Sequence, residues 1–242
     1  MNQYHFCSLG HSEALDFAKL FLQQYGWQSA LPSNADCLLL PVPSFDSNGM
    51  IIGCSNTKEL PKCPVVIGGN LPIGLFPAVN TIDLLQDPIY LAENAAITAQ
   101  CAVRLAMSEL PVTLRHCPVL IIGWGRIGKC LAALLKKFDA NVTVAARNPM
   151  DRALLQALDY QTVHTEKLDA TPYRLIFNTV PTTLLPDCPG QSLKIDLASK
   201  PGLGGSNLIH ARGLPNRYAP ESSGKLIADS IIRIISGKEH TQ

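Results

Sequence analysis

A strand, a glycine-rich turn, a helix and a second strand are expected in succession between Val119 and Asn148, and this stretch constrains the fold most. Its turn holds Gly123, Gly125 and Gly128 in the spacing G-x-G-x-x-G. In dinucleotide-binding folds the first glycine permits the tight turn, the second lets backbone approach a pyrophosphate, and the third lets helix pack on strand. The spacing therefore predicts a dinucleotide site with the phosphates at the helix N-terminus.

The residues around the turn support this interpretation over a Rossmann-like shell that binds nothing. An apolar run precedes the turn, and the residues after it repeat first at helical and then at strand spacing. The helical repeat consists of Ile127, Leu131, Leu134 and Leu135, and the strand alternation of Val142 and Val144. We expect the cofactor to contact Gly123, Gly125, Arg126, Ile127 and Gly128.

The end of the second strand bears on the choice of cofactor. A chain that uses NAD usually places Asp or Glu here to hold the ribose 2′-hydroxyl. This chain has Ala146, followed by Arg147 and Asn148. Because no carboxylate at that position repels a 2′-phosphate and a guanidinium can bind one, NADP is favoured over NAD. We therefore expect Arg147 and Asn148 to contact the cofactor, and the alternative for Arg147 is an arginine that is merely solvated.

Composition limits the classes of partner and compartment. The chain has 242 residues and a net charge of +1 without a Lys/Arg run, so neither nucleic acid nor an anionic membrane is an expected partner. The start of the chain does not resemble a signal peptide, and we expect a cytoplasmic protein. Eight cysteines are scattered without metal-ligand spacing, so we predict reduced core residues and no metal site. These are Cys7, Cys37, Cys54, Cys63, Cys101, Cys117, Cys130 and Cys188.

Strands that alternate with helices predict an α/β fold, with a doubly wound parallel sheet of the Rossmann type and a second, smaller α/β domain. We expect an N-terminal α/β domain over 1–90, an interdomain helix over 91–111 and an NADP-binding domain over 112–220. A helix over 221–242 would return toward the N-terminal domain. Strands are expected at 4–9, 37–42, 64–68, 77–85, 174–178, 193–197 and 207–211, and further helices from Ser12 and at 149–158.

Candidate site residues follow the strands, because ligands of open parallel sheets lie outside the carboxyl ends of the strands. The loop after the 174–178 strand holds Asn178, Thr179, Val180 and Pro181, which are expected to contact the cofactor. The next loops offer Asp196, Ser199, Lys200 and Arg217 as catalytic or substrate-binding groups. For Asp196, capping of local backbone amides is an equal alternative.

Together these loops resemble the A subunit of dipicolinate synthase. The resemblance is carried by Gly123 to Gly128, Ala146-Arg147, Phe177 to Pro181, Asp196 to Gly202, Gly213-Leu214-Pro215, and Ala219-Pro220 with Ser223-Gly224. It implies a sporulation enzyme that oxidises dihydrodipicolinate to dipicolinate with NADP, binding a small dicarboxylate in an interdomain cleft. Ser199, Lys200 and Arg217 would then neutralise and orient the carboxylates.

Two other functions stay open. One is an NADP-dependent dehydrogenase that acts on a hydroxy acid or a shikimate-like acid. The other is a non-catalytic NADP-binding subunit that requires a second dipicolinate synthase subunit. A homo-oligomer is the expected assembly in each case.

Overall fold

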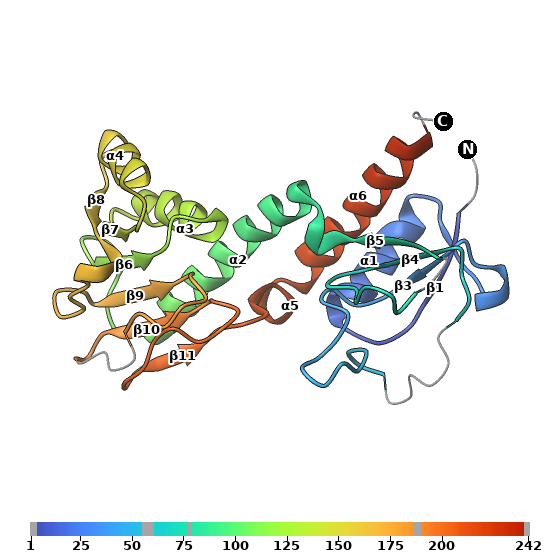
Figure 1. Ribbon diagram of the computed structural model, residues 1–242, viewed down its shortest axis with the longest axis horizontal. Coiled ribbons are helices and arrows are strands. Elements are labelled where there is room, and N and C mark those ends of the chain that lie inside the picture. Colours follow the sequence, from blue (N-terminus) through green and yellow to red (C-terminus); the bar gives the residue numbers. More distant parts are fainter. Residues whose placement is uncertain (1–3, 55–60, 77–78, 186–189, 240–242) are drawn as a thin grey trace. The chain divides into compact units, whose positions relative to one another are not determined.

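The computed structural model describes residues 4–54, 61–76, 79–185 and 190–239. The chain divides into two compact units (Figure 1). The first consists of Met1–Asn94 with Pro215–Gln242, and the second of Ala95–Leu214. Each unit has a parallel sheet flanked by helices, so the predicted α/β class is confirmed.

Five parallel strands form the described part of the first unit's sheet, in the order β2-β1-β3-β4-β5. They are β1 (His5–Ser8), β2 (Gln28–Ser29), β3 (Cys37–Leu39), β4 (Val65–Gly68) and β5 (Asn80–Asp83). Short 3-10 helices lie at η1 (Pro32–Asn34) and η2 (Leu84–Gln86). The strand order is that of flavodoxin-like sheets, in which the chain reverses direction across the sheet between β1 and β3.

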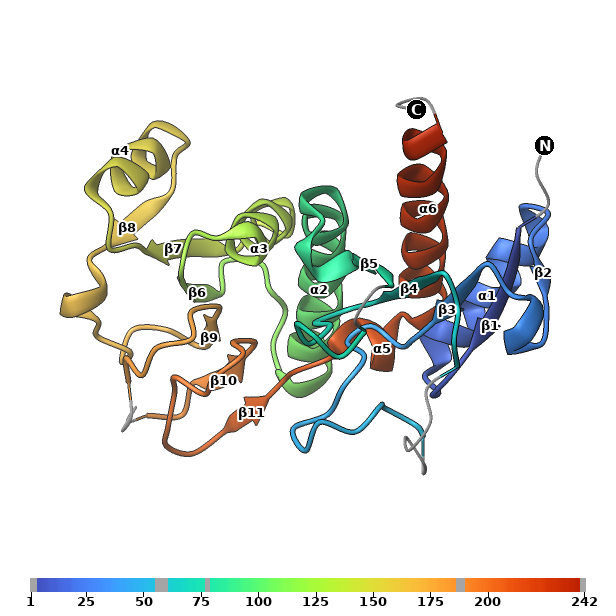
Figure 2. The same ribbon diagram turned by 45° about the vertical axis from the view of Figure 1, so that its right-hand side comes forward.

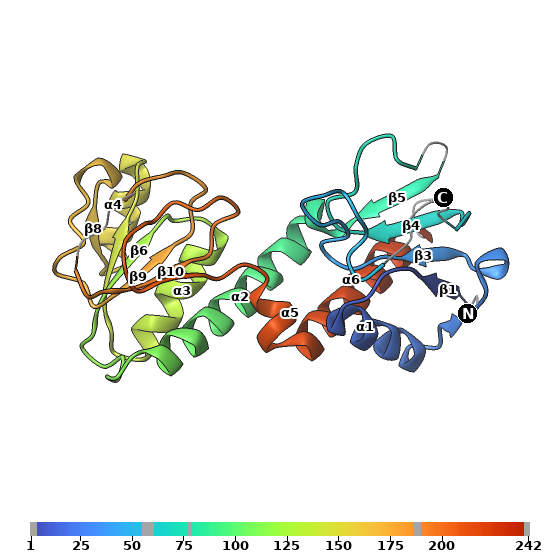
Figure 3. The same cartoon turned by 90° about the horizontal axis from the view of Figure 1, so that it is seen from below.

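Helices α1 (Glu13–Gln24) and α6 (Pro220–Glu239) lie side by side in the first unit (Figure 3). Ser12 caps α1 as predicted, because its side chain accepts a hydrogen bond from the Leu15 N–H at 3.1 Å. Gly224 allows the close approach of α6, since a Cβ at this position would lie 2.7 Å from the Ala14 carbonyl oxygen.

An ion pair ties α6 to the start of α2 (Pro88–Glu109). Arg233 of α6 donates to the carboxylate of Asp87, which also accepts from the Ile89 N–H at 2.9 Å. Burial alone would raise the pKa of Asp87, but these hydrogen bonds hold it below its ordinary value. The C-terminal helix is therefore fixed within this unit by packing and by charge.

The described part of the second unit contains six parallel strands in the order β11-β10-β9-β6-β7-β8 (Figure 2). They are β6 (Pro118–Ile122), β7 (Asn141–Ala145), β8 (Gln161–Val163), β9 (Leu175–Asn178), β10 (Leu193–Asp196) and β11 (Leu208–His210). The connecting helices are α3 (Arg126–Lys137), α4 (Pro149–Ala157) and η3 (Thr165–Lys167). This is the Rossmann strand order, with its reversal between β6 and β9.

Several elements differ from the sequence expectations. The strand expected over 37–42 ends at Leu39, and the one expected over 77–85 has its first two residues outside the described part. Strands β2 and β8 were not expected from the sequence, because they are short edge strands with little apolar content. A short helix, α5 (Leu214–Tyr218), occupies a stretch interpreted as loop.

The cysteines within the described residues form no disulfide with one another, and Cys188 lies outside those residues. Burial raises the pKa of Cys37 to about 12, and burial together with the neighbouring Cys63 thiol raises that of Cys7 to about 12. Both thiols are thus protonated and unreactive at neutral pH.

The described residues contain neither a membrane-spanning helix nor a cluster of metal-ligating side chains. No helix there has both the length and the apolar character required to cross a bilayer. No group of three or more His, Cys, Asp or Glu side chains there could hold a metal ion.

We expect Gly224→Ala to destabilise the first unit by about 1–3 kcal/mol, because the added methyl group must push α6 away from α1. Thermal unfolding measures the effect. Gly237→Ala on the same helix is the matched control, since a Cβ there would meet nothing within 4 Å. The control should be neutral or stabilise by up to about 1 kcal/mol. Equal stability of the two variants would contradict the close packing at Gly224.

Candidate functional site

The carboxyl ends of the central strands of the second unit are in register. Ile122 pairs with Ala145 on one side and with Asn178 on the other, and Asn178 pairs with Asp196. The loops that begin at Gly123, Ala146, Thr179 and Leu197 therefore leave the same edge of the sheet. Because the chain reverses between β6 and β9, the loops after these two strands border the ligand crevice typical of such sheets.

A different physical reason accounts for glycine at each of the three positions of the turn. Gly123 has a φ of +105°, which favours glycine, and a Cβ there would lie 2.5 Å from Thr179 Oγ1. A Cβ on Gly128 would collide with the carbonyl oxygen of Gly123, so this residue lets α3 pack against the turn. A Cβ on Gly125 would meet nothing within 4 Å. Gly125 is thus required neither by its backbone angles nor by packing, which agrees with space reserved for a ligand.

The N-terminus of α3 has the features of an anion-binding site. Its N-cap is Gly125, which offers no side-chain hydrogen bond to the first N–H groups of the helix. The first turn contains no acidic residue, and Arg126 at its start is exposed. A cation at this end opposes the helix dipole, so a bound anion would relieve an unfavourable arrangement.

A pocket of about 360 Å³ opens beside the turn. It is bordered by the glycine turn, the β7–α4 loop and the loop after β9. The lining residues are Gly123, Trp124, Ala145, Ala146, Arg147, Asn148, Asp151, Thr165, Val180, Pro181, Thr182 and Leu184. Five residues of the predicted cofactor set are among them: Gly123, Arg147, Asn148, Val180 and Pro181.

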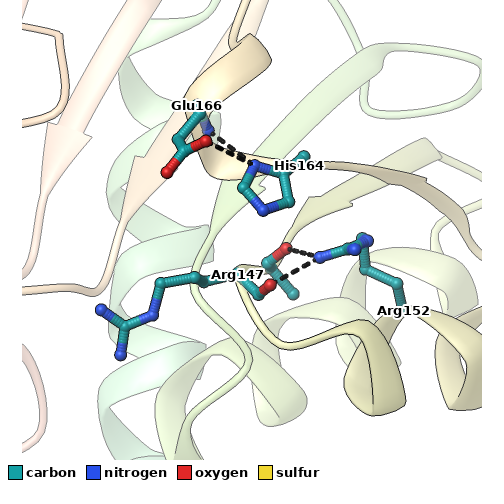
Figure 4. Close-up of polar contacts among 5 residues, drawn as sticks. Arg147, Arg152, His164 and Glu166 are labelled. Atoms are coloured by element: carbon teal, nitrogen blue, oxygen red, sulfur yellow. Dashed lines mark hydrogen bonds and ion pairs between the residues drawn. The ribbon is translucent and has the colours of Figure 1, made fainter.

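Arg147 extends from the end of β7 as an exposed side chain that lines the pocket (Figure 4). Asn148 has a structural task as well, because its Oδ1 caps α4 by accepting from the Met150 N–H at 2.9 Å. His164, beyond the next strand, caps η3 through a hydrogen bond from the Glu166 N–H to Nδ1 at 3.1 Å.

Sequence reasoning missed four pocket residues with polar groups, namely Trp124, Asp151, Thr165 and Thr182. Asp151 brings a carboxylate to the wall that also carries Arg147, although the end of the strand itself has none. Its position in the first turn of α4, after the Asn148 cap, was the available signal. Trp124 contributes a buried indole Nε1 that has no hydrogen-bond partner among the described residues. Such an unsatisfied group beside a pocket is consistent with a ligand site.

Asn178 is fully buried, and its amide is used within the protein. Its Nδ2 donates to the Val180 carbonyl at 3.1 Å and to Asp196 Oδ1 at 2.9 Å, and its Oδ1 accepts from the Val180 N–H at 3.2 Å. In this structure the amide that was expected to contact the cofactor is bonded within the protein, where it shapes the loop. Thr179 braces the glycine turn, because its Oγ1 donates to the Ile122 carbonyl at 2.9 Å.

Asp196 is 1% exposed, and its carboxylate accepts four hydrogen bonds. Besides Asn178, the donors are the N–H groups of Ala198 at 3.1 Å, Gly202 at 2.7 Å and Leu203 at 3.2 Å. In this structure the carboxylate is therefore bonded to protein donors and is not exposed to a substrate. The alternative left open by the sequence, capping of backbone amides, is what the structure contains.

The other three predicted catalytic residues have exposed side chains. Ser199 and Lys200 lie on the loop after β10, which Asp196 holds from beneath. Arg217 belongs to the first unit, on α5, where its guanidinium lies 5.2 Å from the ring centroid of Tyr218. Its neighbour Asn216 donates to the carbonyl of Val42, just beyond β3, at 3.4 Å.

Gly125→Val should abolish dinucleotide binding with little change in the melting temperature, because the side chain fills ligand space and its Cβ would meet no protein atom within 4 Å. Titration calorimetry and thermal unfolding measure the two properties. Gly128→Ala is the contrasting variant, and it should destabilise the unit by about 1–3 kcal/mol because of its collision with Gly123. Unfolding of the Gly125 variant, or unchanged binding by it, would count against the assigned role.

No family model and no curated protein matches the sequence. Among solved structures, dipicolinate synthase, A chain, from Bacillus subtilis is similar with a TM-score of 0.82 and 18% identity, over 100% of this chain and 99% of that one. The corresponding protein from Bacillus halodurans gives 0.79 and 19%, over 96% and 97%. D-lactate dehydrogenase from Escherichia coli gives 0.59 and 10%, over 98% of each chain. The resemblance indicated by the motifs is confirmed at the level of the fold: this chain is built like the A subunit of dipicolinate synthase and, more distantly, like D-lactate dehydrogenase.

Proposed function

We propose that this chain is an NADP-dependent oxidoreductase that converts dihydrodipicolinate to dipicolinate. The observation that carries the proposal is the combination of the unobstructed Gly125, the uncapped α3 N-terminus and the pocket that Arg147 lines. The structural likeness to the A subunit of dipicolinate synthase supports the choice of reaction.

The proposed preference for NADP depends on the balance of two charges in the pocket. Arg147 can form charge-assisted hydrogen bonds with a 2′-phosphate dianion. Asp151 on the same wall would repel that dianion and would accept a hydrogen bond from a ribose 2′-hydroxyl instead. We favour NADP because the guanidinium directly follows Ala146 at the strand end, where dinucleotide-binding chains read the ribose.

Ser199 and Lys200 are proposed to bind the substrate carboxylates. Both side chains are exposed on a loop whose backbone is fixed by Asp196, so they can meet a ligand without reorganising the loop. Lys200 supplies a positive charge and Ser199 a hydroxyl donor. Arg217, on α5 of the first unit, is proposed separately as a carboxylate-binding cation.

The chemistry requires the substrate ring to lose a hydride and a proton. An oxidised nicotinamide supplies the hydride acceptor, and the aromatic product makes the reaction favourable. The protein then has to hold the dicarboxylate in one orientation and compensate its charge. This demand matches a rigid loop with a cation and a hydroxyl better than it matches a buried acid such as Asp196.

Arg147→Ala should weaken NADP binding by roughly 1.5–3 kcal/mol, about ten- to a hundredfold in Kd, because hydrogen bonds to a charged group are lost. NAD binding should change little, since NAD lacks the 2′-phosphate. Asp151→Asn should act in the opposite direction and tighten NADP binding. Titration calorimetry with both dinucleotides measures these effects, and unchanged NADP affinity in both variants would remove the two residues from the discriminating site.

Purified protein given dihydrodipicolinate and NADP should form dipicolinate and NADPH in equal amounts. Lys200→Ala and Ser199→Ala should lower kcat/KM by about tenfold or more while leaving NADP affinity intact, because carboxylate contacts orient the reacting ring. Absorbance of NADPH and of the pyridine product measures turnover. Loss of NADP affinity in these variants would assign them to the cofactor instead.

The assay also separates the competing functions. It should be run with and without the second subunit of a dipicolinate synthase. Turnover only in its presence would favour a binding subunit that needs a partner. Bound NADP without product under both conditions would leave a hydroxy-acid or shikimate-like dehydrogenase as the better hypothesis.

A further inference from the structure

The turn between β7 and α4 is held by a residue that the proposed cofactor site does not include. Arg152 of α4 reaches back to the end of the strand (Figure 4). Its Nη1 donates to the carbonyl of Ala146 at 2.8 Å and to the carbonyl of Arg147 at 2.7 Å. One guanidinium nitrogen therefore holds two successive carbonyl groups.

These bonds restrict the backbone that carries Arg147. The Ala146 N–H donates to the Val163 carbonyl at 3.1 Å, which continues the pairing of β7 with β8. The two carbonyls held by Arg152 belong to the peptide planes on either side of Arg147, and the Ala146 N–H belongs to the plane before them, so this stretch of backbone has little freedom to rotate. The Arg147 side chain extends away from Arg152 (Figure 4), so the two guanidinium groups have different tasks.

Helix α4 does not need Arg152 in order to begin. Asn148 caps its first turn through the Met150 N–H, and Pro149 occupies the first helical position, where its fixed φ favours a helix. The two bonds of Arg152 go to residues before the cap. Their energetic effect therefore falls on the turn that presents Arg147 to the pocket.

The positive charge of Arg152 also affects the electrostatics of the turn. Arg147 and Arg152 place two positive charges at one turn, and neither forms an ion pair with a carboxylate of the described residues. Asp151 on the same pocket wall supplies one negative charge, so the three side chains together keep a net positive charge, which a 2′-phosphate beside Arg147 would compensate. A neutral ribose hydroxyl would gain much less from the same arrangement.

We propose that Arg152 is a positioning residue for dinucleotide discrimination, which acts through Arg147 and does not itself bind the 2′-phosphate. The inference rests on the proposed binding of NADP. Removing Arg152 should free the turn, so that Arg147 must be ordered when the ligand binds, at an entropic cost that lowers affinity. The loss should concern NADP far more than NAD.

A double-mutant cycle tests this directly. Wild type, Arg152→Ala, Arg147→Ala and the double variant are titrated with NADP and with NAD, and their melting temperatures are compared without ligand. Arg152→Ala should weaken NADP binding by about tenfold, within the range for residues that share a hydrogen-bond network, and NAD binding by less than about twofold. In the Arg147→Ala background the same substitution should have almost no effect.

Two further variants separate the hydrogen bonds of Arg152 from a general effect of lost charge. Arg152→Lys should restore part of the NADP affinity, because an ammonium group can still donate to both carbonyls. Arg115→Ala, an exposed arginine of the same unit on the stretch before β6, is the matched control for lost charge and should leave both affinities unchanged.

Each outcome has a distinct meaning. Additive losses in the cycle would overturn the inference, because Arg152 would then contact the phosphate independently. Equal losses for NADP and NAD would also overturn it and would indicate general damage to the site. A wild type that does not prefer NADP would refute the proposed cofactor preference first, and this inference with it.

Discussion

The buried carboxylate of Asp196 is the interaction on which the ligand-binding edge of the second unit depends. An ionised group that is withdrawn from water is tolerated only when hydrogen bonds replace its hydration. Asn178 and the N–H groups of Ala198, Gly202 and Leu203 supply them. Because these donors belong to β9 and to the loop after β10, satisfying one carboxylate fixes two neighbouring loops at once. Ser199 and Lys200 are left on the outside of the second loop.

The same edge combines rigid backbone with uncompensated charge. Thr179, in the loop after β9, donates a hydrogen bond to the last carbonyl of β6, just before the glycine turn. Arg152 donates to the Ala146 carbonyl, just after β7. The N–H groups at the start of α3 have no side-chain cap, and Arg126 lies at the end of the helix that repels cations. An anion bound there would interact favourably with the N–H groups and with Arg126, which is the physical basis for the proposed place of the dinucleotide phosphates.

The two sheets differ in the space available at the point where the strand order reverses. In the second unit the space beside Gly125 is open. In the first unit the corresponding position after β1 is occupied by the chain itself: a Cβ on Gly10 would lie 2.5 Å from the Ile52 carbonyl oxygen, which accepts the His11 N–H at 2.9 Å. The loop that contains Ile51, a fully buried residue, thus covers this point. Two parallel sheets of similar construction therefore offer ligands different surfaces.

Local patterns in the sequence were sufficient for the α/β class, for the glycine turn with its strand and helix, and for the Ser12 cap, because spacing and cap chemistry act over a few residues. The short strands β2 and β8 were missed, since edge pairing owes more to neighbouring strands than to composition. The sequence also named Asn178 and Asp196 as site residues but could not show that they bind each other and not a ligand. The partners of Asn178 and Asp196 depend on which groups folding brings together and which it removes from water. The same is true of the position of Asp151 and Trp124 at the pocket and of the bonds from Arg152 to the carbonyls that follow β7. Only the tertiary structure determines those two things.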